Sequence, residues 1–287
     1  MTDPATHPAS QPSAQPTTAD VSGLHAFVTG GAGALGRATA THLVQLGYTV
    51  HLADIDEAAV TRVAEEFAAT GGRVHAYVCD VSDPESVNDA AQAVVHQVSV
   101  DAGTIDLVVN NAGTTHVDDL LNVTFKTWRR VMSVNADGVF LVGQAFSRLM
   151  VSQPVNPVTG RRGMVVNVGS VAAEVGRPPR AAYGASKALV KHLTMTQALA
   201  LAEHQVAACL LVPGEVIDGM LTDIYERTAA VAGRDVGDLI REAEMQLPRQ
   251  QFQTPDEIGQ RIAFLASSPG MTLNGTTLWC DSRLTSF

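Results

Sequence analysis

Three residues of the sequence have the types and spacing needed for proton transfer: Ser170, Tyr183 and Lys187. Tyr183 and Lys187 are four residues apart, so on a helix their side chains lie on the same face, one turn from each other. A phenol titrates at about pH 10, and a cation one turn away favours the phenolate and lowers that pKa. With a hydroxyl to hold a substrate oxygen, this set suits general acid–base chemistry on an alcohol or carbonyl. A Tyr and a Lys at this spacing are also common on solvated helices, so the rest of the chain has to decide.

The segment before Ser170 predicts where that hydroxyl lies. Met164–Val168 is apolar and rich in β-branched residues, which is typical of a buried strand. Ser170 follows the carboxyl end of this strand. In an open α/β sheet, ligands bind at that edge.

Strand-like and helix-like segments alternate along the chain from Gly23. The predicted strands are Leu24–Thr29, Tyr48–Ala53, Arg73–Cys79, Ile105–Asn110, Met164–Val168, Val206–Val212 and Thr276–Cys280. The predicted helices are Ala34–Leu46, Glu57–Ala69, Pro84–Val98, Thr124–Met150 with a break near Asn135, Tyr183–Glu203 and Pro255–Ser267. This alternation predicts an α/β fold: a single-domain Rossmann fold with a doubly wound, seven-stranded parallel sheet and helices on both faces.

Two regions lie outside this alternation. Residues 1–22 are rich in Pro, Ala, Thr, Ser and Gln and are predicted to be a flexible tail, which leaves residues 23–287 as the folded domain. Residues 215–251 contain helical stretches and begin at the same edge as Ser170. We therefore expect them to cover a substrate.

Composition excludes several classes of function. The 287 residues are 46% hydrophobic and carry a net charge of -10, which argues against nucleic acid as a partner. No apolar run approaches the ~18 residues of a membrane span. Cys79, Cys209 and Cys280 are far apart, which predicts reduced thiols and a cytoplasmic protein. The histidines show no metal-ligand spacing, so no metal is expected.

The amino-terminal part of the chain has the features of a dinucleotide site. Thr29–Gly36, TGGAGALG, follows the first predicted strand and opens a helix, so its backbone amides can approach a pyrophosphate. Asp54 ends the second predicted strand, eighteen residues after Gly36. A carboxylate there binds ribose hydroxyls and repels a 2′-phosphate, which predicts NAD rather than NADP. The alternative is that Asp54 only caps the following helix.

Together these segments resemble the short-chain dehydrogenase/reductase family, from about Gly23 to Asp281. The resemblance is carried, in order, by Thr29–Gly36, Asp54, Cys79–Val81, Asn110–Gly113, Asn135, Ser170, Tyr183 with Lys187, and Pro213–Val216. Each motif is modest alone, but the combination in this order and spacing is specific.

The resemblance implies roles for individual residues. Tyr183 would be the general acid/base, and Lys187 would lower its pKa and bind the nicotinamide ribose. Ser170 would orient the substrate oxygen, and Asn135 would hold a water that links Lys187 to solvent. The implied cofactor-binding residues are Gly30, Gly33, Leu35, Gly36, Asp54, Asp80, Val81, Asn111, Ala112, Gly113, Tyr183, Lys187, Pro213, Gly214 and Val216.

The substrate-binding residues are expected to be Ser170, Tyr183, Arg180 and Glu215. An arginine can bind a carboxylate through two parallel hydrogen bonds, so Arg180 suggests an acidic substrate. Glu215 could instead neutralise Arg180, or favour a polyol or an amine.

The sequence departs from the family at three places. Ala34 stands where glycine is usual, and Asp218 stands where a threonine often contacts the nicotinamide carboxamide. Asp281-Ser282-Arg283 replaces the usual Asp-Gly-Gly near the last strand.

The expected function is hydride transfer between NAD(H) and a small secondary alcohol or ketone, with a hydroxy acid or a polyol as candidate substrates. One alternative is an NADPH-dependent carbonyl reductase of the oxoacyl type. Another is a dinucleotide-binding regulatory protein without catalysis. The resemblance also implies a homo-oligomer, a dimer or tetramer, formed through the helices at Ala136–Met150 and Tyr183–Glu203.

Overall fold

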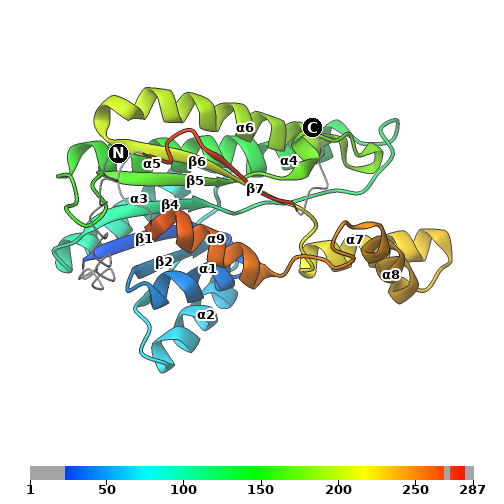
Figure 1. The fold of residues 1–287 in the computed structure, drawn as a ribbon, viewed down its shortest axis with the longest axis horizontal. Coiled ribbons are helices and arrows are strands. Elements are labelled where there is room, and N and C mark those ends of the chain that lie inside the picture. Colours follow the sequence, from blue (N-terminus) through cyan, green and yellow to red (C-terminus); the bar gives the residue numbers. More distant parts are fainter. Residues whose placement is uncertain (1–22, 268–271, 282–287) are drawn as a thin grey trace, which may run out of the picture.

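A computed structural model describes residues 23–267 and 272–281 of the chain (Figure 1). The predicted tail, residues 1–22, lies outside the described residues. Within the described part, the alternating pattern of the sequence forms one parallel sheet with helices on both of its faces.

The sheet has seven strands in the order β3-β2-β1-β4-β5-β6-β7, and all neighbours are parallel. Its strands are β1 (Leu24–Thr29), β2 (Thr49–Asp54), β3 (Val74–Val78), β4 (Thr104–Asn110), β5 (Gly163–Val168), β6 (Val206–Pro213) and β7 (Thr277–Cys280). The predicted doubly wound, seven-stranded sheet is confirmed, with strand ends that differ by at most one residue. Strand order reverses between β1 and β4, so the carboxyl ends of these two strands flank the crevice in which such folds bind ligands.

Helices pack on the two faces of the sheet (Figure 1). On one face, α1, α2 and α9 contribute to the larger buried core, and on the other α3, α5 and α6 contribute to a second one. The helices are α1 (Ala34–Gln45), α2 (Glu57–Ala69), α3 (Pro84–Val100), α4 (Phe125–Met132), α5 (Gly138–Ser152), α6 (Ala181–Leu201), α7 (Gly219–Ala232), α8 (Val236–Gln246) and α9 (Pro255–Ser267). Strands β4, β5 and β6 are buried on both faces, as their continuous apolar runs require.

The predicted break in the long helical region is a π-helical turn. Residues Ser133–Asp137 join α4 to α5 without leaving the helical path. The extra residue of a π turn changes the direction of the side chains around Asn135. Such turns are frequent at functional sites.

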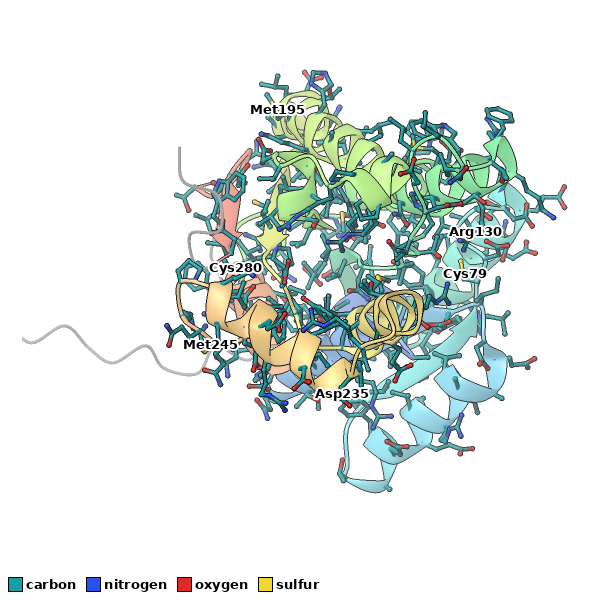
Figure 2. The ribbon with its side chains drawn as sticks, turned by 90° about the vertical axis from the view of Figure 1, so that its right-hand side faces the viewer. Cys79, Arg130, Met195, Asp235, Met245 and Cys280 are labelled. Carbon is teal, nitrogen blue, oxygen red and sulfur yellow. The ribbon has the colours of Figure 1, made fainter. Side chains whose placement is uncertain are left out.

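Helices α7 and α8 form a separate layer beside the carboxyl ends of the strands (Figure 1). They share a small apolar cluster around Leu221, Leu247 and Phe252. Figure 2 looks onto this layer, with Asp235 at the start of α8 and Met245 near its end. We call α7 and α8 with their connecting loops the cap (residues 215–251). At the base of the cap, the backbone N–H of Gln253 donates to the carbonyl of Glu215 at 2.9 Å. The side-chain oxygen of Gln253 accepts the N–H of Gly214, just past the end of β6, at 2.8 Å.

Polar residues are also buried near the amino ends of the strands. His25 and His51 are 0% exposed. Nδ1 of His25 lies 2.9 Å from Nε2 of His51, whose Nδ1 lies 3.0 Å from the hydroxyl of Tyr77. Close by, the carboxylate of Asp106 accepts a 2.9 Å hydrogen bond from the side-chain amide of Asn156.

All three cysteines are free thiols. Cys79, just past β3, and Cys280, on β7, lie on opposite sides of the molecule in Figure 2. No helix in the described ranges has the length and apolar character needed to cross a membrane. The same residues contain no group of three or more His, Cys, Asp or Glu able to hold a metal ion.

Candidate active site

The turn between β1 and α1 is shaped by glycine. Gly30 has φ +66°, in the left-handed region that glycine adopts without strain. A Cβ atom on Gly36 would lie 2.3 Å from the carbonyl oxygen of Gly30, so the turn closes only if position 36 lacks a side chain. Gly33 is the N-cap of α1 and offers no side chain to the first backbone N–H groups. Those groups are suited to an anion such as a pyrophosphate.

The loop after β4 holds this turn in place. The side-chain amide of Asn111 donates to the carbonyls of Thr29 and Gly30, at 2.9 and 3.2 Å. In return, the hydroxyl of Thr29 accepts the backbone N–H groups of Asn111 and Ala112, each at 3.0 Å. Asn111 therefore fixes the glycine turn, and the adjoining Ala112 and Gly113 line the same cavity.

Asp54 lies at the rim of β2 and faces the glycine turn. One carboxylate oxygen accepts the backbone N–H of Ala32 at 3.0 Å, and the other accepts that of Asp56 at 3.2 Å. The N-cap of α2 is Asp56, which accepts the N–H of Ala59 at 2.9 Å. The alternative explanation of Asp54 as the helix cap therefore does not hold.

A cavity of about 350 Å³ lies at the carboxyl edge of the sheet, beneath α7. It brings together most of the predicted site. The predicted residues that line it are Gly30, Gly33, Leu35, Asp54, Asn111, Ala112, Gly113, Ser170, Arg180, Tyr183, Lys187, Pro213, Gly214, Glu215 and Val216. Both halves of the expected chemistry, dinucleotide binding and proton transfer, therefore share one space.

Four predicted residues lie outside the lining, and three of them act in packing or in backbone support. Gly36 closes the glycine turn. The carboxylate of Asp80 accepts both the backbone N–H and the hydroxyl of Ser82, at 2.9 and 2.7 Å. The side chain of Val81 packs against Gly138, where a Cβ atom would lie only 2.8 Å from it.

Asn135 is the fourth, and it is completely buried. Its side-chain oxygen accepts the N–H of Thr114 at 2.8 Å, and its amide donates to the carbonyl of Thr114 at 2.9 Å. The same amide donates to the hydroxyl of Ser186 at 3.0 Å. Asn135 therefore connects the loop after β4 with α6, the helix that carries Tyr183 and Lys187.

Tyr183 lies in the first turn of α6, and Ser170 lies just past the end of β5. Burial is the main cause that raises the pKa of the Tyr183 phenol. A hydrogen bond with Ser170 and the charge of Arg180 lower this pKa, and the charge of Asp218 raises it. The hydroxyl group of Ser170 also accepts the N–H of Ala172 at 3.1 Å, which orients it.

Lys187 differs from the expectation in one respect. Its ammonium group donates to the carbonyl of Val168 at 2.7 Å and lies 5.8 Å from the centre of the Tyr183 ring. It is not among the groups that lower the pKa of Tyr183 here; Ser170 and Arg180 are. Burial lowers the pKa of Lys187 itself to about 8.

Charged side chains border the substrate half of the cavity. Arg177 pairs with Glu215, with 3.4 Å between Nη2 and Oε1, whereas the sequence had suggested Arg180 as the partner. Asp218 is the N-cap of α7 and accepts the N–H of Leu221 at 2.8 Å. Its carboxylate is therefore engaged in the start of the cap.

Sequence reasoning did not identify the apolar lining contributed by the cap. Met220, Leu221 and Ile224 of α7 border the cavity. Their spacing of three and four residues places them on one face of a helix, and that signal was present in the sequence.

Comparison with known proteins decides the family. A family model described as short chain dehydrogenase matches residues 24–229. The chain belongs to this short-chain dehydrogenase family. This short-chain dehydrogenase is therefore an oxidoreductase of alcohol or carbonyl groups whose family binds a nicotinamide dinucleotide, and the cavity residues described above fit such a group.

Relatives of the short-chain dehydrogenase span its length. It is 31% identical over 264 residues to 3-oxoacyl-(acyl-carrier-protein) reductase FabG of Thermotoga maritima, covering 92% of this chain and 98% of the relative. It is 31% identical over 265 residues to gluconate 5-dehydrogenase of Gluconobacter oxydans, covering 92% and 96%. Among solved structures, an NAD+-bound xylitol dehydrogenase matches with a TM-score of 0.81 and 28% identity, covering 91% of this chain and 98% of that one.

Proposed function

We propose that this short-chain dehydrogenase transfers a hydride between NAD(H) and a small secondary alcohol or its ketone. The observation that carries the proposal is the single cavity lined by the glycine turn, by Asp54 and by Ser170, Tyr183 and Lys187. The bound nicotinamide would supply the hydride acceptor or donor, and the protein would manage the proton.

In this mechanism Tyr183 takes a proton from the alcohol during oxidation and returns it during reduction. Ser170 holds the substrate oxygen, because its hydroxyl hydrogen-bonds the phenol and its orientation is fixed by Ala172. Lys187 lies one helical turn further on and is available to the ribose of the cofactor. Asn135 fixes the loop after β4 against α6, the helix that carries Tyr183 and Lys187.

Asp54 supports NAD over NADP. Its carboxylate borders the cavity beside the start of α1, where an adenosine ribose would lie. A negative charge at that place repels a 2′-phosphate. The solved xylitol dehydrogenase that resembles this chain is NAD-bound, which agrees with this assignment.

Steady-state rates with the two cofactors test the assignment. We expect kcat/KM for NAD to exceed that for NADP by at least tenfold, and Asp54→Ser to reduce this ratio by at least tenfold. Asp56→Asn is the matched control, because it changes a carboxylate two residues away that caps α2. A wild-type preference for NADP would refute the assignment.

The similarity to FabG favours one second candidate, an NADPH-dependent reduction of an oxoacyl group. The same cofactor comparison separates it from the main proposal. A protein that binds NADH but turns over no alcohol, polyol, hydroxy acid or ketone would instead indicate a regulatory role.

The cap is proposed to cover the substrate. Its α7 residues line the cavity, and Arg180 and Glu215 are proposed to contact the substrate together with Ser170. A hydroxy acid or a polyol fits such a charged lining, and the relatives named for gluconate and xylitol are in keeping with this.

We also propose a homo-oligomer, a dimer or tetramer, formed through α5 and α6. Their outer face carries exposed apolar side chains: Phe140, Leu199 and Met195, the last at the top of Figure 2. The free thiols support a reducing compartment such as the cytoplasm. Light scattering and analytical ultracentrifugation would measure the assembly.

A further inference from the structure

The charged side chains around the cavity can be accounted for one by one. Those that line it are Asp54, Arg177, Arg180, Lys187, Glu215 and Asp218. Lys187 donates to a backbone carbonyl, at 2.7 Å. Asp54 accepts two backbone N–H groups, and Asp218 accepts the N–H of Leu221 at the start of α7. These three charges are therefore engaged by the backbone of the protein.

Arg177 and Glu215 neutralise each other. The guanidinium and carboxylate are 3.4 Å apart, and the side chain of Glu215 is only 15% exposed. Glu215 is held from two further sides. Its backbone carbonyl accepts the N–H of Gln253 at 2.9 Å, and its side chain shares a hydrogen bond with Tyr225 of α7. The carboxylate is thus fixed on the Arg177 side of the cavity.

Arg180 takes no part in this ion pair. Within the described part of the chain, its guanidinium has no carboxylate within ion-pair distance and no hydrogen-bond acceptor. Its one close partner is the ring of Tyr183, whose centre lies 6.0 Å from Cζ. A half-buried cation beside the proposed general acid/base has unused donors that point to an anionic ligand.

We infer that Arg180 binds a carboxylate of the substrate, which makes the substrate a short hydroxy acid or its oxo acid, and that Arg177 is a positioning residue that holds Glu215 away from Arg180. This inference rests on the proposed function and narrows its substrate class. It also assigns a role to Arg177 and Tyr225, which do not touch the reacting atoms. Without the Arg177 pair, the unneutralised charge of Glu215 would offset that of Arg180 in the same cavity and weaken the anion site.

The test uses a matched pair of substrates, 3-hydroxybutyrate and its methyl ester, with NAD. The measured quantity is the ratio of kcat/KM for the acid to kcat/KM for the ester. This ratio reports discrimination for charge, and a general loss of activity cancels from it. The variants are Arg180→Gln, Arg177→Gln, Glu215→Gln and the double variant Arg177→Gln/Glu215→Gln.

Each of the four variants has a defined expected effect on this ratio. Arg180→Gln lowers the ratio about tenfold or more, because a charged hydrogen bond to the carboxylate is lost. Arg177→Gln also lowers it, because Glu215 loses its counter-charge and then repels the substrate carboxylate. Adding Glu215→Gln to that variant restores the ratio to near the wild-type value. Glu215→Gln alone raises it, because Arg177 becomes a second unpaired cation.

Arg227→Gln is the charge-matched control. Arg227 is on the solvent side of α7 and pairs with Asp223, so the variant removes one positive charge from the cap but none from the cavity. We expect it to leave the ratio unchanged. An equal loss of ratio in this control would assign the effect to overall charge and overturn the inference.

A binding measurement separates this inference from the proposed function. The NADH complex is titrated calorimetrically with butyrate and with butanamide. We expect butyrate to bind at least tenfold more tightly, and Arg180→Gln to remove the difference. Selective binding of butyrate by a protein that oxidises nothing would overturn the proposed function alone. Turnover without any preference for the acid, or failure of Glu215→Gln to rescue Arg177→Gln, would overturn this inference alone.

Discussion

The two ends of the same sheet contain buried polar side chains of quite different use. At the carboxyl end, Ser170, Tyr183 and Lys187 meet at a cavity. At the amino end, His25 hydrogen-bonds His51, and His51 hydrogen-bonds the hydroxyl of Tyr77. One set keeps its donors and acceptors facing a ligand space, and the other uses them within the protein.

The difference teaches what burial does to titratable groups. At both ends burial is the main cause of the pKa shifts: it raises the pKa of Tyr183, lowers that of His51 to about 3 and raises that of Asp106 to about 7. At the carboxyl end such a shift would tune the proposed proton transfer by Tyr183. At the amino end it makes folding depend on pH.

The largest expected effect comes from a pair of variants, each of which removes one hydroxyl, at the carboxyl end or the amino end of the sheet. Tyr183→Phe should lower kcat by at least about 100-fold, the usual contribution of a general acid/base, with little change in the affinity for NADH. Tyr77→Phe, which loses the contact with His51, should cost about 1 kcal/mol of unfolding free energy and leave kcat unchanged. Turnover assays and denaturant unfolding measure both. Retention of full activity by Tyr183→Phe would refute the mechanism.

The second prediction concerns His51 and pH. Its pKa is lowered from 6.5 to about 3 in the folded protein, by burial first and then by the charges of His25 and His75. Its contribution to stability is therefore complete above pH 6.5 and is lost as pH falls toward 3. Relative to His51→Gln, the wild type should lose up to ~1.4 kcal/mol per pH unit in that range.

The variant is needed as the reference because Asp106 acts in the opposite sense. Its pKa is raised from 3.8 to about 7, so its contribution to stability is complete below 3.8 and is lost as pH rises toward 7. Unfolding curves of wild type and His51→Gln between pH 4 and 7 give the difference. A difference independent of pH would show that His51 is not held neutral.

A third prediction tests whether stability and NADH binding depend on the tight packing of the glycine turn at the carboxyl end of the sheet. In Gly36→Ala the new Cβ would press on the carbonyl of Gly30, so we expect a loss of ~1–3 kcal/mol in stability and weaker NADH binding. Gly176→Ala is the control, because a Cβ there meets nothing within 4 Å. Fluorescence titration with NADH and thermal unfolding measure the two effects. Equal behaviour of both variants would mean that the turn can relax.

The smallest effect is expected at Asp218. Asp218→Asn keeps an N-cap for α7 but removes the charge that raises the pKa of Tyr183. The pKa of the phenol should fall, so the rise of kcat for alcohol oxidation should move to lower pH by less than about one unit. The pH profile of kcat measures it. A shift to higher pH would contradict the assigned sign.

Local signals in the sequence predicted the sheet and most of the cavity. The run Leu24–Thr29 predicts a strand, and the glycines that follow it predict a tight turn. Neither prediction needs knowledge of any distant residue. The same holds for the spacing of Tyr183 and Lys187, because a helix fixes which side chains share a face. The parallel order then brings the carboxyl ends together, so Asp54 and Ser170 meet at one edge.

Pairings between distant segments could not be predicted in this way. Glu215 pairs with Arg177 rather than Arg180, and this depends on how the cap packs. Lys187 donates to the carbonyl of Val168, a residue of a different element. The contact between His25 and His51 joins two strands, and either histidine alone reads as an ordinary polar residue. In each case the partner is set by tertiary packing, which no local pattern encodes.

The attachment of α7 and α8 has a consequence for how this protein could change over time. These helices have a small apolar core of their own. The stretch around Glu215, which leads into them, is hydrogen-bonded to Gln253, which follows them. Exchanging the residues between those two points would leave Ser170, Tyr183, Lys187 and the glycine turn in place. New substrate specificities could thus arise, in nature or by grafting, without a change in the sheet and the helices that cover it.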